Sequence, residues 1–173
     1  ERYWDVDFTK KVVFKTQEEY AELLWEKLTE STELCMVSDV PVGAFLSGGI
    51  DSSTVVGIMS RLSSRKIKTF SIDFDVKNFS EITYARKVAQ RFGTEHYEFI
   101  VKPDIIEILP RLIWHYNEPF GDSSMVPSYY MASQTKKYLT VALSGDGGDE
   151  NLAGYTRYWQ TLLLEKIVNF THI

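Results

Sequence analysis

Short apolar runs rich in β-branched and aromatic residues alternate with longer segments of helical periodicity along this 173-residue chain. We expect strands at residues 41–46, 66–74, 95–101 and 139–144. We expect three helices at residues 16–38, 51–63 and 80–93. A fourth is expected from residue 103 to a polar loop at 117–127, a fifth from that loop to residue 138, and a last one from residue 151 onward. This alternation predicts an α/β fold, with a mainly parallel sheet covered by helices on both faces.

Several local signals sharpen the helix boundaries. Thr16 and Glu19 have the spacing of a capping box, which satisfies the first free N–H groups of a helix. Ser80 is placed to cap the third helix, and Gly93 to end it. Pro110 lies inside an apolar periodic segment, where we expect it to break or kink the helix.

Composition excludes several classes of protein. The net charge is −5 with acids and bases mixed, which gives no electrostatic footprint for nucleic acid. There is no apolar run of about 18 residues, so we expect no membrane partner. The single cysteine, Cys35, allows no intramolecular disulfide, and this favours a reducing, cytoplasmic location. We expect Cys35 to be a packed small residue and not a nucleophile.

The stretch "FLSGGIDSS", residues 45–53, joins the first strand to the helix after it. Its glycines allow close backbone approach, its three serines offer hydroxyls, and the following helix N-terminus favours an anion. A carboxylate at Asp51 repels phosphate oxygens unless a cation such as Mg²⁺ lies between them. The structural alternative is an ordinary turn in which these side chains only cap the helix.

The pattern is not one of the commonest phosphate loops. A Walker loop needs a Gly-Lys pair, and a Rossmann fingerprint needs Gly-x-Gly-x-x-Gly; neither is present. The Ser-Gly-Gly-x-Asp-Ser pattern resembles the pyrophosphate loop (PP-loop) of the ATP-pyrophosphatase family. The resemblance implies an adenine nucleotide alpha hydrolase-like fold and a substrate that is adenylated with release of pyrophosphate.

A second glycine-rich stretch, "SGDGGDE" at residues 144–150, follows the last strand. Ligands of parallel sheets bind at the carboxyl ends of the strands, so the two stretches are expected to form one site. In this interpretation Asp149 shares Mg²⁺ with Asp51, and the backbone near Ser144 and Gly145 contacts the nucleotide. The alternative is a solvated turn with Asp149 as a helix cap.

Three motifs in order are more specific: "DVPVGAFLSGGIDSS", "NEPFGDSSMVPSYYMA" and "LSGDGGDENLAGYTRY". They resemble the synthetase domain of glutamine-hydrolysing asparagine synthetases, and the resemblance covers essentially the whole chain. It implies attack of an aspartate side-chain carboxylate on the α-phosphorus of ATP, followed by displacement of AMP by ammonia. The cofactors implied are ATP and Mg²⁺, and the small-molecule partners are ATP, aspartate and ammonia.

The resemblance also implies roles for individual residues. Asp51 and Asp149 would hold the metal, Asp146 would help to deprotonate the incoming ammonium, and Tyr155 would add a hydroxyl near the phosphates. Leu46 and Ile72 would lie near the adenosine. The residues expected to cradle the pyrophosphate are Ser47, Gly48, Gly49, Ser52 and Ser53. For three residues of the polar loop, contact with the substrate and an ordinary surface position are equally favoured interpretations: Glu118, Asp122 and Ser123.

The resemblance predicts the domain organisation as well. Residues 1–15 resemble a linker remnant from an N-terminal glutaminase domain that this chain does not contain, and residues 16–173 are expected to be a synthetase domain incomplete at its C-terminus. We therefore expect no glutamine hydrolysis. Asn151 replaces an apolar residue of the family pattern, which we expect to affect how its helix packs. Two other functions remain alternatives: a nucleotide-binding piece without catalysis, and a relative with another acceptor, such as a β-lactam-forming synthetase. A homodimer is a further alternative for the assembly of the chain.

Overall fold

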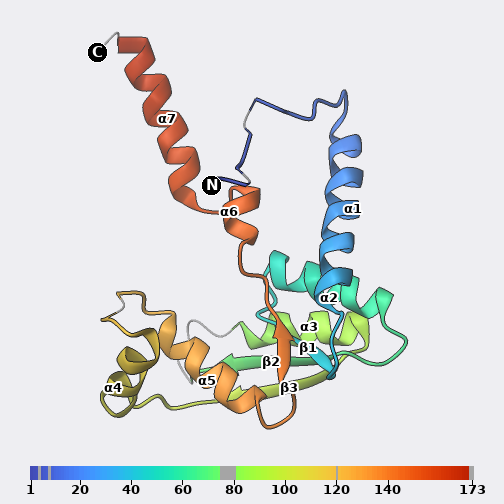
Figure 1. Ribbon diagram of the computed structural model, residues 1–173, viewed down its shortest axis with the longest axis vertical. Helices are drawn as coiled ribbons and strands as arrows, with labels where there is room; N and C mark the ends of the chain where they lie inside the picture. Colours follow the sequence, from blue (N-terminus) through green and yellow to red (C-terminus); the bar gives the residue numbers. More distant parts are fainter. Residues whose placement is uncertain (4, 8, 75–80, 120, 172–173) are drawn as a thin grey trace.

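The computed structural model describes residues 1–3, 5–7, 9–74, 81–119 and 121–171. Its sheet has four parallel strands in the order β3-β2-β1-β4 (Figure 1). The strands are β1 (Val42–Phe45), β2 (Lys68–Asp73), β3 (Glu95–Ile100) and β4 (Val141–Leu143). The predicted parallel α/β fold is confirmed. Because β1 lies between β2 and β4, the loops that follow β1 and β4 leave the sheet side by side.

Seven helices are described along the chain. They are α1 (Gln17–Cys35), α2 (Ile50–Leu62), α3 (Ile82–Phe92), α4 (Ile105–Tyr116), α5 (Met125–Thr135), α6 (Gly148–Leu152) and α7 (Thr156–Thr171). The capping box of Thr16 and Glu19 is confirmed, as is the end of α3 at Gly93, whose φ is +66°. The predicted cap Ser80 lies outside the described residues, and Glu81 occupies the N-cap position of α3.

The two faces of the sheet are covered by different helices. Ala44 and Leu46 point to the face where α2 and α3 pack, and they form the core with Val56, Met59 and Ala85. Alternate strand residues point to the opposite face, where α5 contacts β2.

On that second face Phe70 is fully buried among aromatic rings. It stacks on Tyr97 with 5.2 Å between ring centroids, and Tyr138 lies 5.9 Å away. The helices therefore cover both faces, as the sequence predicts.

Two helix boundaries differ from the expectation. Of the break or kink expected at Pro110, the break does not occur: α4 continues through this residue, and burial of Ile108 and Leu112 on either side stabilises the helix despite the missing N–H donor. The predicted single last helix is divided into α6 and α7, because α6 ends at Leu152 and its C-cap residue Ala153 has a left-handed φ of 57°. The N–H of Gly154 then donates to the carbonyl of Asp149 and closes the turn.

The chain ends extend from the sheet. Residues 1–15 contain no helix or strand among those that the structure describes, and their origin as a linker stays a prediction. Cys35 is exposed at the end of α1, so the expectation that it is packed is wrong. α7 projects away from the sheet (Figure 1). No helix in the described ranges combines the length and apolar character that a membrane span requires.

Candidate functional site

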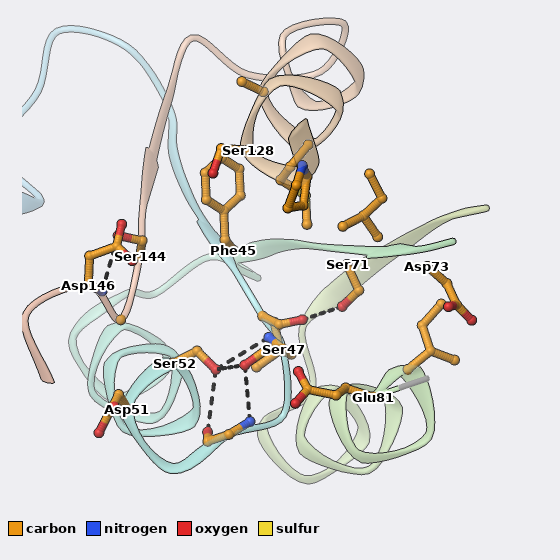
Figure 2. Close-up of a pocket in the computed structure, with 18 of the residues that line it drawn as sticks. Phe45, Ser47, Asp51, Ser52, Ser71, Asp73, Glu81, Ser128, Ser144 and Asp146 are labelled. Carbon is orange, nitrogen blue, oxygen red and sulfur yellow. Dashed lines mark hydrogen bonds between the residues drawn. The ribbon is translucent and has the colours of Figure 1, made fainter. Parts of the chain in front are cut away.

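A cleft of about 800 Å³ opens at the carboxyl ends of β1, β2 and β4. Its walls come from the turn after β1, the end of β2, the start of α3, α5, and the turn after β4 (Figure 2). The lining residues that the sequence predicts as site residues are Leu46, Ser47, Gly49, Asp51, Ser52, Ile72, Ser144, Gly145 and Asp146. Nine predicted residues from three separate segments thus meet around one cleft.

The first loop, residues 47–52, is held in shape by its own hydroxyl groups (Figure 2). The Ser47 N–H donates to the Ser52 hydroxyl at 3.3 Å, and the two hydroxyl oxygens lie 3.0 Å apart. The Gly49 N–H donates to the Ser47 hydroxyl at 3.1 Å, while the Ser52 hydroxyl donates to the Gly49 carbonyl at 3.3 Å. The backbone and the serines therefore form one closed hydrogen-bonded loop.

Gly48 shows why this loop needs glycine. Its φ is +89°, and a Cβ on it would lie 2.5 Å from the Ala85 nitrogen and 2.6 Å from the Tyr84 Cβ. The loop therefore lies directly on the first turn of α3, and a larger residue at this position would push the two apart.

The first turn of α2 faces the same cleft. Gly49 is its N-cap, and no side chain of the described residues caps the helix there. The amides at the start of a helix lack intrahelical partners and carry the positive end of the helix dipole. They can bind an anion such as a phosphate group. The Ser47 and Ser52 hydroxyls, which are bonded within the loop here, would have to exchange these bonds to donate to it.

The second loop, residues 144–149, is in contact with the first. A Cβ on Gly145 would lie 2.7 Å from the Ser52 nitrogen and 3.1 Å from the Asp51 Cβ. A Cβ on Gly148 would lie 2.5 Å from a carboxylate oxygen of Asp51. The glycines of the second loop therefore make room for the first turn of α2, and the two loops form one surface.

Two carboxylates of the two loops line the cleft. Asp51 is half-buried, and Asp146 accepts a hydrogen bond from the Ser144 hydroxyl at 2.9 Å. Asp149 is not among the lining residues, and its carboxylate lies against Gly154. Mg²⁺ is typically held by one or two carboxylates together with phosphate oxygens, and Asp51 and Asp146 are the carboxylates of the two loops that line the cleft and could contribute to such a site. The described residues contain no group of three or more His, Cys, Asp or Glu side chains that could hold a metal alone.

Tyr155 lies beyond α6 and does not line the cleft. Its hydroxyl donates to the Glu150 carboxylate at 2.6 Å, and this hydrogen bond raises the pKa of Tyr155 to about 12. The Arg157 guanidinium lies 4.3 Å from the centre of its ring. The hydroxyl is therefore paired with Glu150 in this structure, and its contact with phosphates stays a prediction.

The two predicted adenosine contacts reach the cleft in different ways. Leu46 is 1% exposed and belongs to the core, although it is also among the residues that line the cleft. Its carbonyl accepts a hydrogen bond from the Ser71 hydroxyl. Ile72 is half-buried and lines the cleft from β2.

Five further predicted residues are not among those that line the cleft: Gly48, Ser53, Glu118, Asp122 and Ser123. The Ser53 hydroxyl is buried and has no hydrogen-bond partner among the described residues. Asp122 is exposed and accepts the Ser124 N–H at 2.8 Å, which lowers the pKa of the Asp122 carboxyl. This bond stabilises the turn that leads into α5; a role in substrate binding stays a prediction.

Sequence reasoning missed much of the cleft wall. The lining residues that were not predicted are Phe45, Phe74, Ser71, Asp73, Glu81, Ile82, Pro127, Ser128, Met131 and Ala132. Ser71 and Asp73 flank Ile72 at a strand end, so the strand-end rule could have found them. Residues 127–132 belong to the quoted motif "NEPFGDSSMVPSYYMA", but the substrate contacts were predicted in the acidic loop before them.

The profile of the asparagine synthase family matches residues 23–170. The chain belongs to the asparagine synthase family. An asparagine synthetase (glutamine-hydrolysing) from Bacillus subtilis is 38% identical over 93% of this chain and 27% of its own length. A putative asparagine synthetase from Methanocaldococcus jannaschii is 43% identical over 88% of this chain and 30% of its own length.

These asparagine synthase relatives are much longer than the matched region, since the chain spans less than a third of each. More distant similarity reaches amidase chyE of Penicillium rubens, 28% identical over 94% of this chain and 27% of that protein. Among solved structures, the glutamine-dependent NAD⁺ synthetase from Acinetobacter baumannii in complex with ADP has a TM-score of 0.53 at 16% identity. The similarity covers 84% of this chain and 29% of that one. It shows a common fold.

Proposed function

We propose that this chain is the ATP-dependent synthetase part of an amide-forming ligase. It would adenylate the side-chain carboxylate of aspartate, release pyrophosphate, and pass the aspartyl group to ammonia to give asparagine and AMP. The observation that carries the proposal is the contact between the two glycine-rich loops, which brings a helix N-terminus with free amides and two carboxylates to one cleft. Membership of the asparagine synthase family supports the same reaction class.

The residues of the cleft suit the polyphosphate of ATP. The Ser47 and Ser52 hydroxyls and the first turn of α2 would bind the pyrophosphate that leaves. Bound Mg²⁺ would neutralise negative charge on the leaving group. Asp51 would hold this ion. Asp149 remains the second ligand that the sequence predicts, although Asp146, and not Asp149, is among the residues that line the cleft.

Electrostatics gives a further reason for a divalent ion. The described lining residues include four carboxylates, Asp51, Asp73, Glu81 and Asp146, and no Lys, Arg or His. A free triphosphate would therefore be repelled, whereas a metal–nucleotide complex carries less negative charge. We propose that the nucleotide enters as its magnesium complex.

The second chemical step needs a neutral amine. Asp146 lines the cleft, and its carboxylate is held by the Ser144 hydroxyl and can accept a proton from an ammonium ion. The ammonia would then attack the aspartyl carbonyl with AMP as the leaving group. In this proposal Asp146 is the base for the amide-forming step.

Calorimetric titration with ATP, with and without Mg²⁺, tests the binding part of the proposal. Metal-dependent binding is expected, and a folded chain that binds neither form would contradict it. AMP and pyrophosphate release is then measured with aspartate and ammonium, with aspartate omitted as the control. Binding without AMP release would favour a nucleotide-binding piece without catalysis.

The acceptor is a separate question, because amidases are also among the similar proteins. A related ligase with another carboxylate substrate, such as a β-lactam-forming synthetase, is the second candidate. A screen of carboxylates for AMP release separates the two: release dependent on aspartate and ammonium supports asparagine formation. Glutamine in place of ammonium is the control for the predicted absence of glutamine hydrolysis.

A further inference from the structure

Ser71 lies near the end of β2 and is 3% exposed. Its hydroxyl donates to the carbonyl of Leu46, the last residue before the first loop (Figure 2). The Leu46 N–H still donates to the Phe70 carbonyl at 2.8 Å, as in a regular parallel ladder. The Ser71 hydroxyl thus holds the Leu46 carbonyl at the point where the ladder between β1 and β2 ends.

The Leu46 carbonyl and the Ser47 N–H belong to one planar peptide group. The carbonyl accepts from Ser71, and the N–H donates to the Ser52 hydroxyl at 3.3 Å. We propose that Ser71 is a positioning residue that fixes the orientation of this peptide, and with it the first loop. The role in binding rests on the proposed function of that loop.

The consequence for the loop follows from its hydrogen bonds. If the peptide rotates, the Ser47 N–H leaves the Ser52 hydroxyl. The Ser47 hydroxyl is bonded to the same Ser52 hydroxyl and to the Gly49 N–H, so the rest of the loop is disturbed as well. Ser71 would act on the bound phosphates through the loop, because its own hydroxyl is already paired with Leu46.

The test compares Ser71→Ala with a matched control, Ser60→Ala. The Ser60 hydroxyl is also buried, but it has no hydrogen-bond partner among the described residues and does not line the cleft. Amide hydrogen exchange at Ser47 and Gly49 is measured on the ligand-free chain, and the affinity for MgATP by calorimetry. Ser71→Cys keeps the shape of the side chain, with a somewhat larger atom that is a weaker donor, and it replaces the alanine variant if that variant fails to fold.

For Ser71→Ala we expect exchange at Ser47 to be about tenfold faster and MgATP binding about tenfold weaker, with a smaller effect for Ser71→Cys and none for Ser60→Ala. Unchanged exchange at Ser47 would overturn the proposal, and so would faster exchange with unchanged affinity. If the unmodified chain does not bind MgATP, the proposed function fails; exchange at Ser47 then decides alone whether Ser71 orients the loop.

Discussion

Gly145 lies against the backbone of Ser52, so closely that a Cβ on the glycine would come within 2.7 Å of the serine nitrogen. Gly145 belongs to the loop after β4, and Ser52 to the first turn of α2. The two residues are far apart in the sequence, yet they leave no space for a methyl group between them. This contact makes the two loops a single surface, and the proposed nucleotide site depends on it.

Gly145→Ala is expected to separate the loops. Forcing a methyl group into packed backbone typically costs about 1–3 kcal/mol of unfolding free energy, and here it also moves Asp51. Thermal denaturation and MgATP titration should both show a loss. Gly121→Ala is the matched control, because nothing lies within 4 Å of its added Cβ. An affinity equal to that of the control would argue against a site formed jointly by the loops.

Asp51→Asn tests the metal role. The amide keeps the shape of the side chain but removes the charge, so Mg²⁺ should no longer raise the affinity for ATP, a loss of about tenfold or more. Asp104→Asn is a suitable control, since Asp104 caps α4 away from the cleft and asparagine caps equally well. Retained magnesium dependence in Asp51→Asn would exclude Asp51 as a ligand.

His96 should make stability depend on pH. Its Nδ1 lies 2.9 Å from the Thr69 hydroxyl, and burial lowers the pKa of His96, opposed by the Glu98 carboxylate 3.6 Å away. With a pKa lower in the folded than in the unfolded state, the unfolded chain binds the proton first. The free energy of unfolding is therefore greatest above pH 6.5 and falls as the pH drops below that value.

Urea denaturation between about pH 5.5 and 8, the range in which histidine is the main side chain to change its charge, measures how the free energy of unfolding depends on pH. His96→Gln should flatten it, whereas His115→Gln, which changes an exposed histidine, should leave it unchanged. Equal slopes in all three proteins would mean that protonation of His96 does not destabilise the fold.

Phe70 should be a major contributor to stability. Its side chain is fully buried and stacks on Tyr97 at 5.2 Å, so Phe70→Ala removes a large apolar volume that the sheet cannot refill. A loss of about 3–5 kcal/mol in the free energy of unfolding is expected by chemical denaturation. Tyr84→Ala changes an aromatic that is 62% exposed and should cost far less. Similar losses would contradict the packing described for this face.

The order and type of the main elements could be predicted because periodicity and caps report local structure directly. The four strands, the capping box at Thr16 and the end of α3 at Gly93 are of this kind. The position of the two loops at adjacent strand ends follows from parallel topology, and this is why nine site residues were found together.

The remaining features depend on tertiary contacts. The division between α6 and α7 arises from a left-handed Ala153, a conformation that its residue type does not signal. The α5 wall of the cleft and the pairing of Tyr155 with Glu150 depend on how distant segments pack. Asn151 likewise bonds its side-chain amide to the Gly147 carbonyl at 2.6 Å, so the polar residue stabilises the second loop from within α6.

The strand order determines how changes in chain length affect the two loops. β1 and β4 are neighbours in the sheet, although β2, β3 and four helices lie between them in the chain. The spacing of the two loops is therefore set by the register of Gly43 with Ala142, and not by the length of the intervening chain. Insertions in the connections between β1 and β4 that leave the strands paired would therefore not change the spacing of the two loops.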